Sequence, residues 1–410
     1  MPLIKPFRGL RPLPERAADF AAPPYDVLSS EEARLRAAGK PWSFLHISKP
    51  EIDLPPATDI YSPLVYATGA ANLKRMVDAG VLKRDSQPCY YAYRLIMGEH
   101  RQTGIVAAAS VAAYDAGRIR RHEFTRPDKE DDRVRQIEAL NAQTGPVLLA
   151  HPASAEIDEI LAAAATTAPV ADVLADTGVR HTLWVIDDKN ALARIGACFD
   201  ALPALYIADG HHRSAAASRV AAARRARQPA ETGADYFLAV SFPGAQMQIL
   251  CYNRVVRDLA GLPRDEFLRR VAQSFTLVPA QAAVQPSAHG ELGMYLPRQW
   301  YRLRIKTEKI PADPVGRLDV SLLSEQLLAP VLDIRDLRTD KRVDFVGGIR
   351  GTQELEKRVD SGEMAAAFSM HATSMEDLMA VTDARQIMPP KSTWFEPKLA
   401  DGLVSHVLDS

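Results

Sequence analysis

Residues 205–217, which read LYIADGHHRSAAA, contain the stretch that decides the fold of this chain. The apolar run at its start predicts a buried strand, and the alanines at its end predict a helix that starts near Ser214. The polar residues are crowded into a tight turn between the two. A turn at the N-terminus of a helix offers free backbone N–H groups and the positive end of the helix dipole, and both favour an anion such as phosphate. The stretch therefore predicts a strand–turn–helix unit with an anion-binding turn.

The side chains of this turn suit the same chemistry. His211, His212 and Arg213 add hydrogen-bond donors of matching charge, and Asp209 could hold a metal ion or accept a proton. Taken singly, Asp209 could be only a turn residue or a helix cap, and the histidines could simply face solvent. The five consecutive residues from Asp209 to Arg213, Gly210 included, together favour a functional site at the end of a strand.

Length, composition and charge exclude several classes of protein. The chain has 410 residues, of which 47% are hydrophobic and 25% charged, so it can bury a sizeable core in two or three structural units. The formal net charge of −1 argues against strong non-specific binding to nucleic acid. The basic stretches at 118–121 and 219–227 are interpreted as solvated faces.

The cysteines and the apolar segments indicate the environment of the protein. Cys89, Cys198 and Cys251 form no CxxC pair, which excludes a disulfide scaffold and disfavours a cysteine-rich zinc site. Residues 1–6 lack the apolar core of a secretory signal, and the sequence has no uninterrupted apolar run of ~18 residues. We therefore expect a cytoplasmic protein that binds neither membrane nor nucleic acid.

Apolar periodicity predicts interleaved helices and strands. Residues 89–97 and 104–114 alternate as a pair of strands, and a helix is expected over 132–144. Another helix is expected over 320–331, with its end at a boundary set by Pro330. Because helices and strands interleave with antiparallel hairpins, the predicted fold class is α+β, with mixed sheets around the strand–turn–helix core.

The chain is expected to fold in three parts. Residues 1–145 form an N-terminal α+β part that contributes acidic site loops, and residues 146–255 form the core with the Asp-Gly-His-His-Arg turn. Residues 256–410 form a C-terminal α+β part whose tail returns to the site. This organisation assumes that polar segments from all three parts meet around the turn.

Two loops of the N-terminal part contain candidate catalytic groups. The sequence Pro-Pro-Tyr-Asp at 23–26 is a rigid turn that presents the Asp26 carboxylate, although Asp is also common in plain turns. His122 and Glu123 lie in a polar loop with Arg133, and a His/Glu pair suits general base catalysis or metal binding. The alternative is a solvated charged loop with a helix cap. Neither HExxH nor HxH spacing occurs here, so a dedicated zinc site is disfavoured.

A further candidate follows two prolines near the C-terminal end. Lys391, Ser392 and Thr393 offer an ammonium group, two hydroxyls and turn backbone, which is the chemistry of a phosphate cradle. The segment is not a Walker motif, because the GxxxxGK[ST] context is absent. The sequence also has no GxGxxG motif between a predicted strand and a predicted helix. It has no GxSxG elbow, which disfavours a standard α/β-hydrolase.

Taken together, these segments resemble an uncharacterised bacterial and archaeal family, the one numbered one thousand and fifteen among the domains of unknown function. The resemblance spans almost the full length and rests on KPFRG at 5–9, PPYDV at 23–27, HE at 122–123, DGHHR at 209–213 and the closing stretch at 389–398. More distantly, the DGHHR turn is similar to the nucleotide-binding turn of the ParB/sulfiredoxin superfamily, which includes free-serine kinases.

This second resemblance implies a role for each residue of the turn. Gly210 to Arg213, with Ser214, would cradle the phosphates of a nucleotide, and Asp209 would contribute to the chemistry or bind magnesium. His211 stands where sulfiredoxins have a cysteine, which argues against the reduction of sulfinic acids. The helix-turn-helix DNA module of ParB proteins is not evident in the sequence.

The leading hypothesis is a nucleotide-dependent kinase that phosphorylates a small hydroxylated metabolite, with free L-serine, converted to O-phosphoserine, as the first choice. It would use Mg²⁺ with ATP or ADP. Asp209 would be joined by a second catalytic carboxylate from Asp26 or Glu123. Substrate binding is expected of Tyr25, His122 and Arg133, and phosphate binding of Gly210, His211, His212, Arg213, Ser214, Lys391, Ser392 and Thr393.

Two other functions remain open at this point. The same turn could bind nucleotide in a regulatory protein without turnover, in which case the other carboxylates would be structural. Alternatively, water could replace the metabolite hydroxyl, which would make the protein a phosphatase or nucleotide hydrolase. In each case the expected partners are small molecules, and the chain could act as a homodimer.

Overall fold

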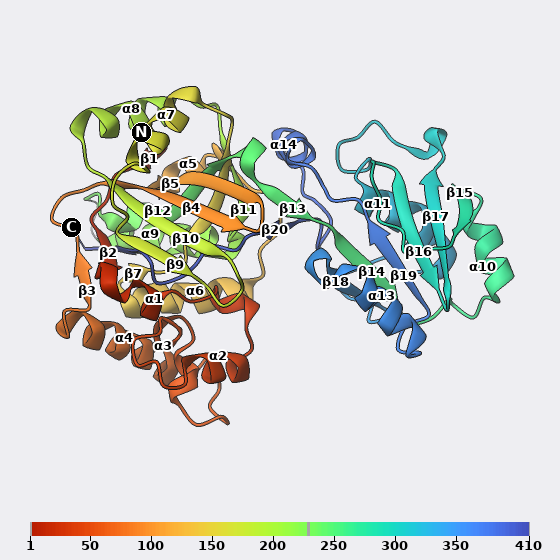
Figure 1. Ribbon diagram of the computed structural model, residues 1–410, viewed down its shortest axis with the longest axis horizontal. Coiled ribbons are helices and arrows are strands. Elements are labelled where there is room, and N and C mark those ends of the chain that lie inside the picture. Colours follow the sequence, from red (N-terminus) through yellow and green to blue (C-terminus); the bar gives the residue numbers. More distant parts are fainter. Residues whose placement is uncertain (1, 228–229, 410) are drawn as a thin grey trace. The chain divides into compact units, whose positions relative to one another are not determined.

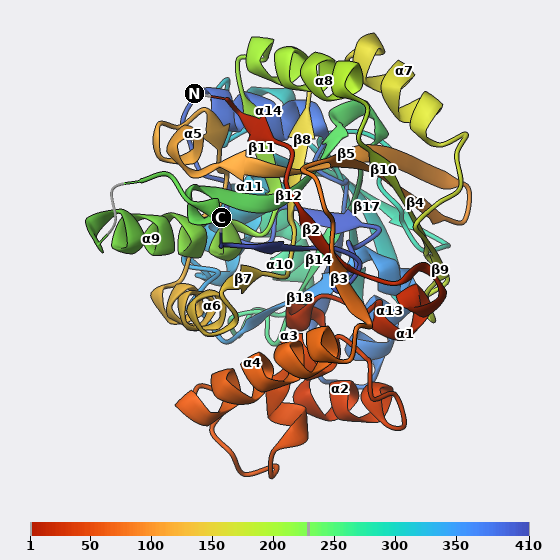
Figure 2. The ribbon, with the colours of Figure 1, turned by 90° about the vertical axis from the view of Figure 1, so that its left-hand side faces the viewer.

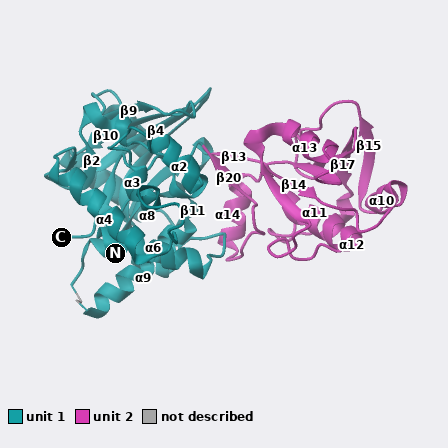
Figure 3. Ribbon diagram, turned by 90° about the horizontal axis from the view of Figure 1, so that it is seen from below, with its two compact units in different colours: residues 1–247, 397–410 teal, residues 248–396 magenta. Residues whose placement is uncertain are grey.

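The computed structural model describes residues 2–227 and 230–409, and these form two compact units. Unit 1 comprises residues 1–247 and 397–410, and unit 2 comprises residues 248–396. Figure 3 colours unit 1 teal and unit 2 magenta. The chain thus leaves unit 1, forms unit 2 and returns to unit 1 for its last residues.

The largest sheet of unit 1 is mixed. Most neighbouring strands are antiparallel, but β11 pairs with β6, and β12 with β8, in parallel. In pairing order the strands are β6 (Ile119–Arg120), β11 (Leu205–Asp209), β8 (Val147–His151), β12 (Tyr236–Pro243), β5 (His100–Ser110), β4 (Tyr90–Met97), β10 (Arg180–Ile186) and β9 (Ala171–Leu174), with β1 (Ile4–Lys5) added at β5 (Figure 1). Helices combined with mixed and antiparallel sheets confirm the predicted α+β class. The boundary expected after residue 145 falls within this sheet, since β12 pairs with both β5 and β8.

Helices and a smaller sheet complete unit 1. The helices are α1 (Ala17–Phe20), α2 (Ser30–Ala37), α3 (Leu45–Ser48), α4 (Pro63–Asp78), α5 (Val111–Asp115), α6 (Pro127–Leu140), α7 (Ala155–Ala164), α8 (Lys189–Ala201) and α9 (His211–Arg227). The smaller sheet pairs β3 (Leu82–Arg84), β2 (Gly9–Pro12), β21 (Ser405–Val407) and β7 (Ala142–Gln143) in that order. Figure 2 shows α7 beside α8 and α6 beside α9.

The strand–turn–helix unit lies in the core of unit 1. Leu205 and Ile207 of β11 are fully buried in the same apolar cluster as Ala217 of α9. The opposite face of α9 packs Ala216 and Val220 against residues of α6. Because alanine has almost no side chain, a helix with alanines on both faces can approach the sheet and a second helix closely. This double packing fixes the turn between β11 and α9.

Two helix boundaries of unit 1 differ from those expected. The helix after the signature strand begins at His211 rather than near Ser214, so the polar side chains occupy its first turn. The helix expected over 132–144 runs from Pro127 to Leu140. Proline is well suited to the first turn, because its missing N–H has no partner there, and Asn141 ends the helix with a left-handed φ of 49°.

Unit 2 is built on an antiparallel sheet. In pairing order its strands are β15 (Phe275–Ala280), β17 (Gln299–Ile305), β16 (Glu291–Leu296), β19 (Ala366–Met370), β14 (Tyr252–Val256) and β18 (Val343–Gly347), and β13 (Gln248–Leu250) pairs separately with β20 (Trp394–Glu396). The helices are α10 (Arg264–Val271), α11 (Asp319–Leu323), α12 (Ala329–Leu332), α13 (Gly351–Asp360) and α14 (Met375–Asp383). Leu355 and Val359 of α13 pack on Val255 and Ala367 of the sheet.

The helix expected over 320–331 is present as a helical run from Asp319 to Leu332, but Pro330 does not set its end. The backbone stays helical past this proline, because a π-helical segment (Ser324–Leu328) separates α11 from α12 and ends just before it. A proline inside a helix lacks one N–H and crowds the preceding turn. The π segment widens that turn and shifts its hydrogen bonds, so Pro330 fits into the first turn of α12. The helical run ends instead at Asp333, which has a φ of 53°.

Across residues 2–227 and 230–409, no helix has both the length and the apolar character needed to cross a bilayer.

Candidate functional site

Asp209 lies at the centre of a charged cluster where β11 ends. Its Oδ2 is 3.3 Å from Nζ of Lys398, and its Oδ1 is 3.5 Å from Nη2 of Arg213. Burial by itself would raise the pKa of Asp209, but the charges of Lys398 and Arg213 outweigh it and hold that pKa below the usual range. Asp209 is therefore ionised at neutral pH. Its side chain is 34% exposed, so a ligand can still reach it.

Arg213 is the buried cation of the site. Its side chain is only 11% exposed, and it donates through Nη1 to the carbonyl oxygen of Pro146. Burial favours its neutral form, but the negative charges of Asp209 and Asp26 prevail and raise its pKa. Asp26, an exposed residue of the short 3-10 helix Tyr25–Val27, thus acts electrostatically on the same cluster. The structure brings these two predicted carboxylates to one cation.

Gly210 makes the sharp change from strand to helix. Its φ is 98°, in the left-handed region, and its carbonyl oxygen accepts the N–H of Ser214 at 3.0 Å to begin α9. A Cβ at this position would lie 3.0 Å from Nε of Arg213. Ser214 is fully buried, and its hydroxyl donates to the His211 carbonyl oxygen at 3.0 Å. Glycine is therefore needed here both for the conformation and for the position of Arg213.

We expect Gly210→Ala to lower the free energy of unfolding by about 1–3 kcal/mol, because it combines a strained φ with a close contact to Arg213. Urea denaturation followed by circular dichroism would measure the change. Gly80→Ala is the matched control: Gly80 has a φ of 70°, but a Cβ there meets nothing within 4 Å. Equal losses in the two variants would show that the contact with Arg213 has no consequence.

The two histidines of the turn are neutral. His211 accepts the backbone N–H of His122 through Nε2 at 3.4 Å, and His212 accepts that of Arg126 through Nε2 at 3.0 Å. Burial lowers the pKa of both imidazoles, and the neighbouring His122 lowers that of His211 further. Positive charge at the turn therefore comes from Arg213 and not from the histidines, contrary to the expectation from sequence. The imidazoles instead hold the loop at 122–126 against the start of α9.

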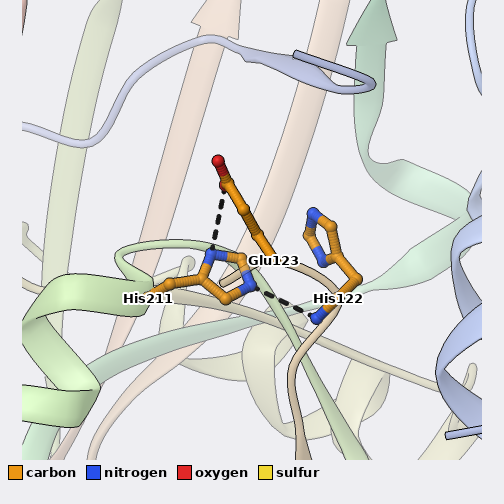
Figure 4. A group of neighbouring side chains, drawn as sticks. All are labelled: His122, Glu123 and His211. Atoms are coloured by element: carbon orange, nitrogen blue, oxygen red, sulfur yellow. Dashed lines mark hydrogen bonds and ion pairs between the residues drawn. The ribbon is translucent and has the colours of Figure 1, made fainter. Parts of the chain in front are cut away.

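His122 and Glu123 meet His211 at this loop (Figure 4). The rings of His122 and His211 are perpendicular, with centroids 4.5 Å apart, and Oε2 of Glu123 is 3.8 Å from Nδ1 of His211. Burial lowers the pKa of His122 to about 4, so this imidazole is also neutral. One donor atom from each of the three residues lies within 4.8 Å of the others.

Tyr25 and Arg133 stack on each other. The guanidinium carbon of Arg133 lies 3.8 Å from the centroid of the Tyr25 ring, which is a close cation–π contact. Arg133 also donates from Nη2 and Nε to Oδ2 of Asp132, at 2.7 and 3.0 Å. The other oxygen of Asp132 accepts the hydroxyl of Tyr66 at 2.9 Å. Arg133 is thus fixed in orientation by α6 and α4.

A small cavity of about 30 Å³ lies beside these residues. Its lining includes Tyr25, Arg133 and Arg213, together with Ser48 and Asp401. The hydroxyl of Ser48 and Oδ1 of Asp401 are buried without a hydrogen-bond partner among the described residues. By volume the cavity holds two or three water molecules, and a few polar groups lie in a wall that is otherwise mostly apolar.

Asp401 is the least expected residue of the site. It is 2% exposed, and burial, only partly opposed by the charge of Arg213, raises the pKa of its carboxyl group to about 7. A backbone bridge between Ala22 and Asp401 brings the tail to the segment that carries Tyr25. Sequence reasoning missed Asp401, Ser48 and the role of Lys398. The one available signal was that Lys398 closes the segment that resembles the family.

The predicted phosphate cradle belongs to unit 2. Nζ of Lys391 lies 5.5 Å from the centroid of the Tyr252 ring. The carbonyl oxygen of Lys391 accepts a hydrogen bond from Nη2 of Arg254 at 3.0 Å. The hydroxyl of Ser392 donates to the Pro389 carbonyl oxygen at 2.6 Å. These contacts are all within unit 2, and the part that Lys391, Ser392 and Thr393 play in phosphate binding stays a prediction.

Comparison with known proteins identifies the family of this chain. It belongs to the family described as "Protein of unknown function (DUF1015)", whose model matches residues 4–321. This confirms the family resemblance drawn from the sequence. A comparison with curated proteins gives no match.

Similar solved structures include a free serine kinase in complex with AMP, at 11% identity over 73% of this chain and 92% of the kinase, with a TM-score of 0.34. SbnI with a C-terminal truncation, from Staphylococcus aureus, matches at 12% identity over 72% of this chain and 85% of that one, with a TM-score of 0.38. A conserved hypothetical protein from Pyrococcus furiosus matches at 12% identity over 73% of this chain and 95% of that one, with a TM-score of 0.34.

Proposed function

We propose that this protein transfers a phosphoryl group from a nucleotide to the hydroxyl group of a small metabolite, with free L-serine as the first acceptor to test. The observation that supports this most strongly is the cluster of Asp209, Arg213 and Lys398 at the start of α9, beside a small cavity. Phosphoryl transfer depends mainly on charge neutralisation and in-line positioning, with little covalent work for the protein. Oriented N–H groups, two cations and an ionised carboxylate supply those needs.

The phosphates would lie against the first turn of α9. The free N–H groups of that turn and the helix dipole favour an anion, and Arg213 and Lys398 add positive charge next to it. Asp209 fits a Mg²⁺ ligand, because it is ionised and partly exposed, and such ions are commonly bound by one or two carboxylates together with phosphates and water. Mg²⁺, when bound, would neutralise charge on the phosphates.

The groups that line the cavity would hold the charged end of the acceptor. Arg133, aligned by Asp132 and Tyr25, suits a carboxylate, and the unpartnered oxygen of Asp401 suits an ammonium group. A guanidinium and an ionisable carboxyl group beside one small cavity favour a compact zwitterion, the form of a free amino acid at neutral pH, because its ammonium group would stabilise the ionised form of Asp401. This is the reason to test serine before other alcohols.

Asp26 is the better candidate for the general base. Its charge acts on Arg213, Arg133 and Asp401, which line the cavity, whereas Glu123 contacts His211. Asp26 would accept the hydroxyl proton as the serine oxygen bonds to phosphorus, and the bond from that phosphorus to the nucleotide oxygen would break. Asp26→Asn should then reduce turnover more than Glu123→Gln.

The test is ³¹P NMR of the purified protein with Mg²⁺, ATP or ADP, and L-serine. The expected result is a phosphoserine signal that requires every component and disappears when L-alanine, which lacks the hydroxyl, replaces serine. Loss of nucleotide at the same rate without serine would make the protein a hydrolase. Nucleotide binding without any turnover would favour a regulatory protein. Either of these outcomes would contradict the kinase proposal.

A further inference from the structure

The three residues that meet at the loop after β6 have the composition of a transition-metal site. His122 and Glu123 are consecutive in that loop, and His211 is the first residue of α9 (Figure 4). Two imidazoles and one carboxylate form a frequent ligand set for first-row divalent metals when further positions remain open for water or substrate. The residues come from two elements that the packing of α9 holds together. We propose that His122, Glu123 and His211 bind a divalent transition metal such as Zn²⁺ or Co²⁺, and this inference does not rest on the proposed kinase function.

The distances allow such a site after a small movement. The three donor atoms lie within 4.8 Å of one another, whereas ligands at ~2.0–2.1 Å from one metal would be roughly 1 Å closer. The Glu123 side chain is 48% exposed, so it can rotate toward the imidazoles, and the same opening gives the metal a path from solvent. The buried histidines then form the fixed side of the site and the glutamate the mobile side.

The hydrogen bonds of the histidines are compatible with ligation. Nδ1 of His211 faces Glu123, while its Nε2 accepts the His122 N–H at 3.4 Å, a long and therefore weak bond. A metal on Nδ1 requires the ring proton to move to Nε2, which replaces this weak bond by two donors that face each other, so the backbone at His122 would have to move slightly away. His122 is hydrogen bonded to the backbone of Ile207, the kind of second contact that orients a metal-binding imidazole.

The ligand chemistry selects against magnesium. Mg²⁺ is a hard ion that prefers oxygen, whereas imidazole nitrogen suits zinc, cobalt, iron and nickel. The site would therefore remain occupied in the Mg²⁺ buffer of the kinase assay. The proposed site also differs in chemistry from the cluster at Asp209. The carboxylate there is paired with the cations Lys398 and Arg213 and would bind Mg²⁺ through oxygen.

The test is titration of the full, nucleotide-free chain with Co²⁺, followed by visible absorption, with Zn²⁺ competition and millimolar Mg²⁺ present throughout. We expect one Co²⁺ per chain, and Glu123→Gln and His211→Gln should each weaken binding by about 10-fold or more. His212→Gln, the neighbour on the same helix turn, should retain it, as should Asp209→Asn. Circular dichroism would check folding, and the exposed Glu123 gives a usable variant if His211→Gln does not fold.

The results of this titration can overturn the metal proposal independently of the kinase proposal. Absence of a Co²⁺ signal in the wild-type chain, or equal affinity in wild type and Glu123→Gln, would overturn the proposal. Loss of Co²⁺ binding in Asp209→Asn, with binding retained in Glu123→Gln, would place the metal site at the end of β11. That result would also overturn the proposal. Because no nucleotide or serine is present, failure of the kinase assay would leave these readings unaffected.

Discussion

Asp209→Asn is expected to lower the rate of phosphoserine formation by about 10²–10⁴-fold while leaving the fold intact. The carboxylate is held ionised by Lys398 and Arg213, and the neutral amide would remove the negative charge that is proposed to bind Mg²⁺. Asparagine keeps the shape of the side chain, but its single amide oxygen can accept from only one of the two cations. The rate measured by ³¹P NMR at saturating nucleotide and serine would test this.

Asp172→Asn is the matched control for that variant. Asp172 also lies on a strand of the large sheet and pairs with an arginine, Arg180, at 2.8 Å, but it lies on β9, at the other end of the sheet order from β11. It should keep full activity. Full turnover in Asp209→Asn would remove Asp209 from the mechanism, and an equal loss in both variants would assign the effect to the stability of the sheet.

Asp401→Asn is expected to make the protein more stable at alkaline pH. Burial raises the pKa of Asp401 to about 7 in the folded chain, from the 3.8 of an unperturbed aspartate. Between these two values the unfolded chain has released the proton while the folded chain still binds it, so wild-type stability falls as pH rises. From pH 5 to pH 8 this group should remove about 3 kcal/mol from the free energy of unfolding. The variant lacks the titrating group and should not show this loss.

Urea denaturation of wild type and variant at pH 5 and pH 8 would measure the difference. From pH 5 to pH 8 the free energy of unfolding of the variant should rise relative to that of the wild type. An equal change in both proteins would exclude a raised pKa at Asp401. The same substitution should raise KM for serine with a smaller effect on kcat, since the amide has no negative charge to pair with an ammonium group. A gain in stability together with weaker binding of the acceptor is what a buried functional charge produces.

Local sequence predicted the centre of the fold well. An apolar run followed by a polar turn and alanines is sufficient to define β11 and α9, because strand, turn and helix each depend on near neighbours. The errors at Ser214 and Pro330 are also local. In the first, polar side chains took the first helical turn, and in the second a π segment absorbed a proline that would otherwise end a helix.

The rest of the site depends on contacts between distant segments. Lys398 and Asp401 reach the turn only because the chain returns after unit 2, and no periodicity in the sequence marks that return. The neutral state of His211 and His212 likewise depends on burial and on two backbone N–H groups more than 80 positions earlier. Residue types indicated the chemistry, but only the packing assigned a charge to each group.

The return of the tail also determines when the site can form during synthesis. β21 joins β2 to β7, and Lys398 and Asp401 precede it, so unit 1 stays incomplete until residues 248–396 have been translated. At ~5–20 residues per second, the ribosome needs on the order of ten seconds for that stretch. During this interval the nascent chain exposes the unpaired edges of β2 and β7, which are templates for wrong pairing. Chaperone demand should therefore be greatest in this interval, and a chain that stops before residue 397 should bear no complete site.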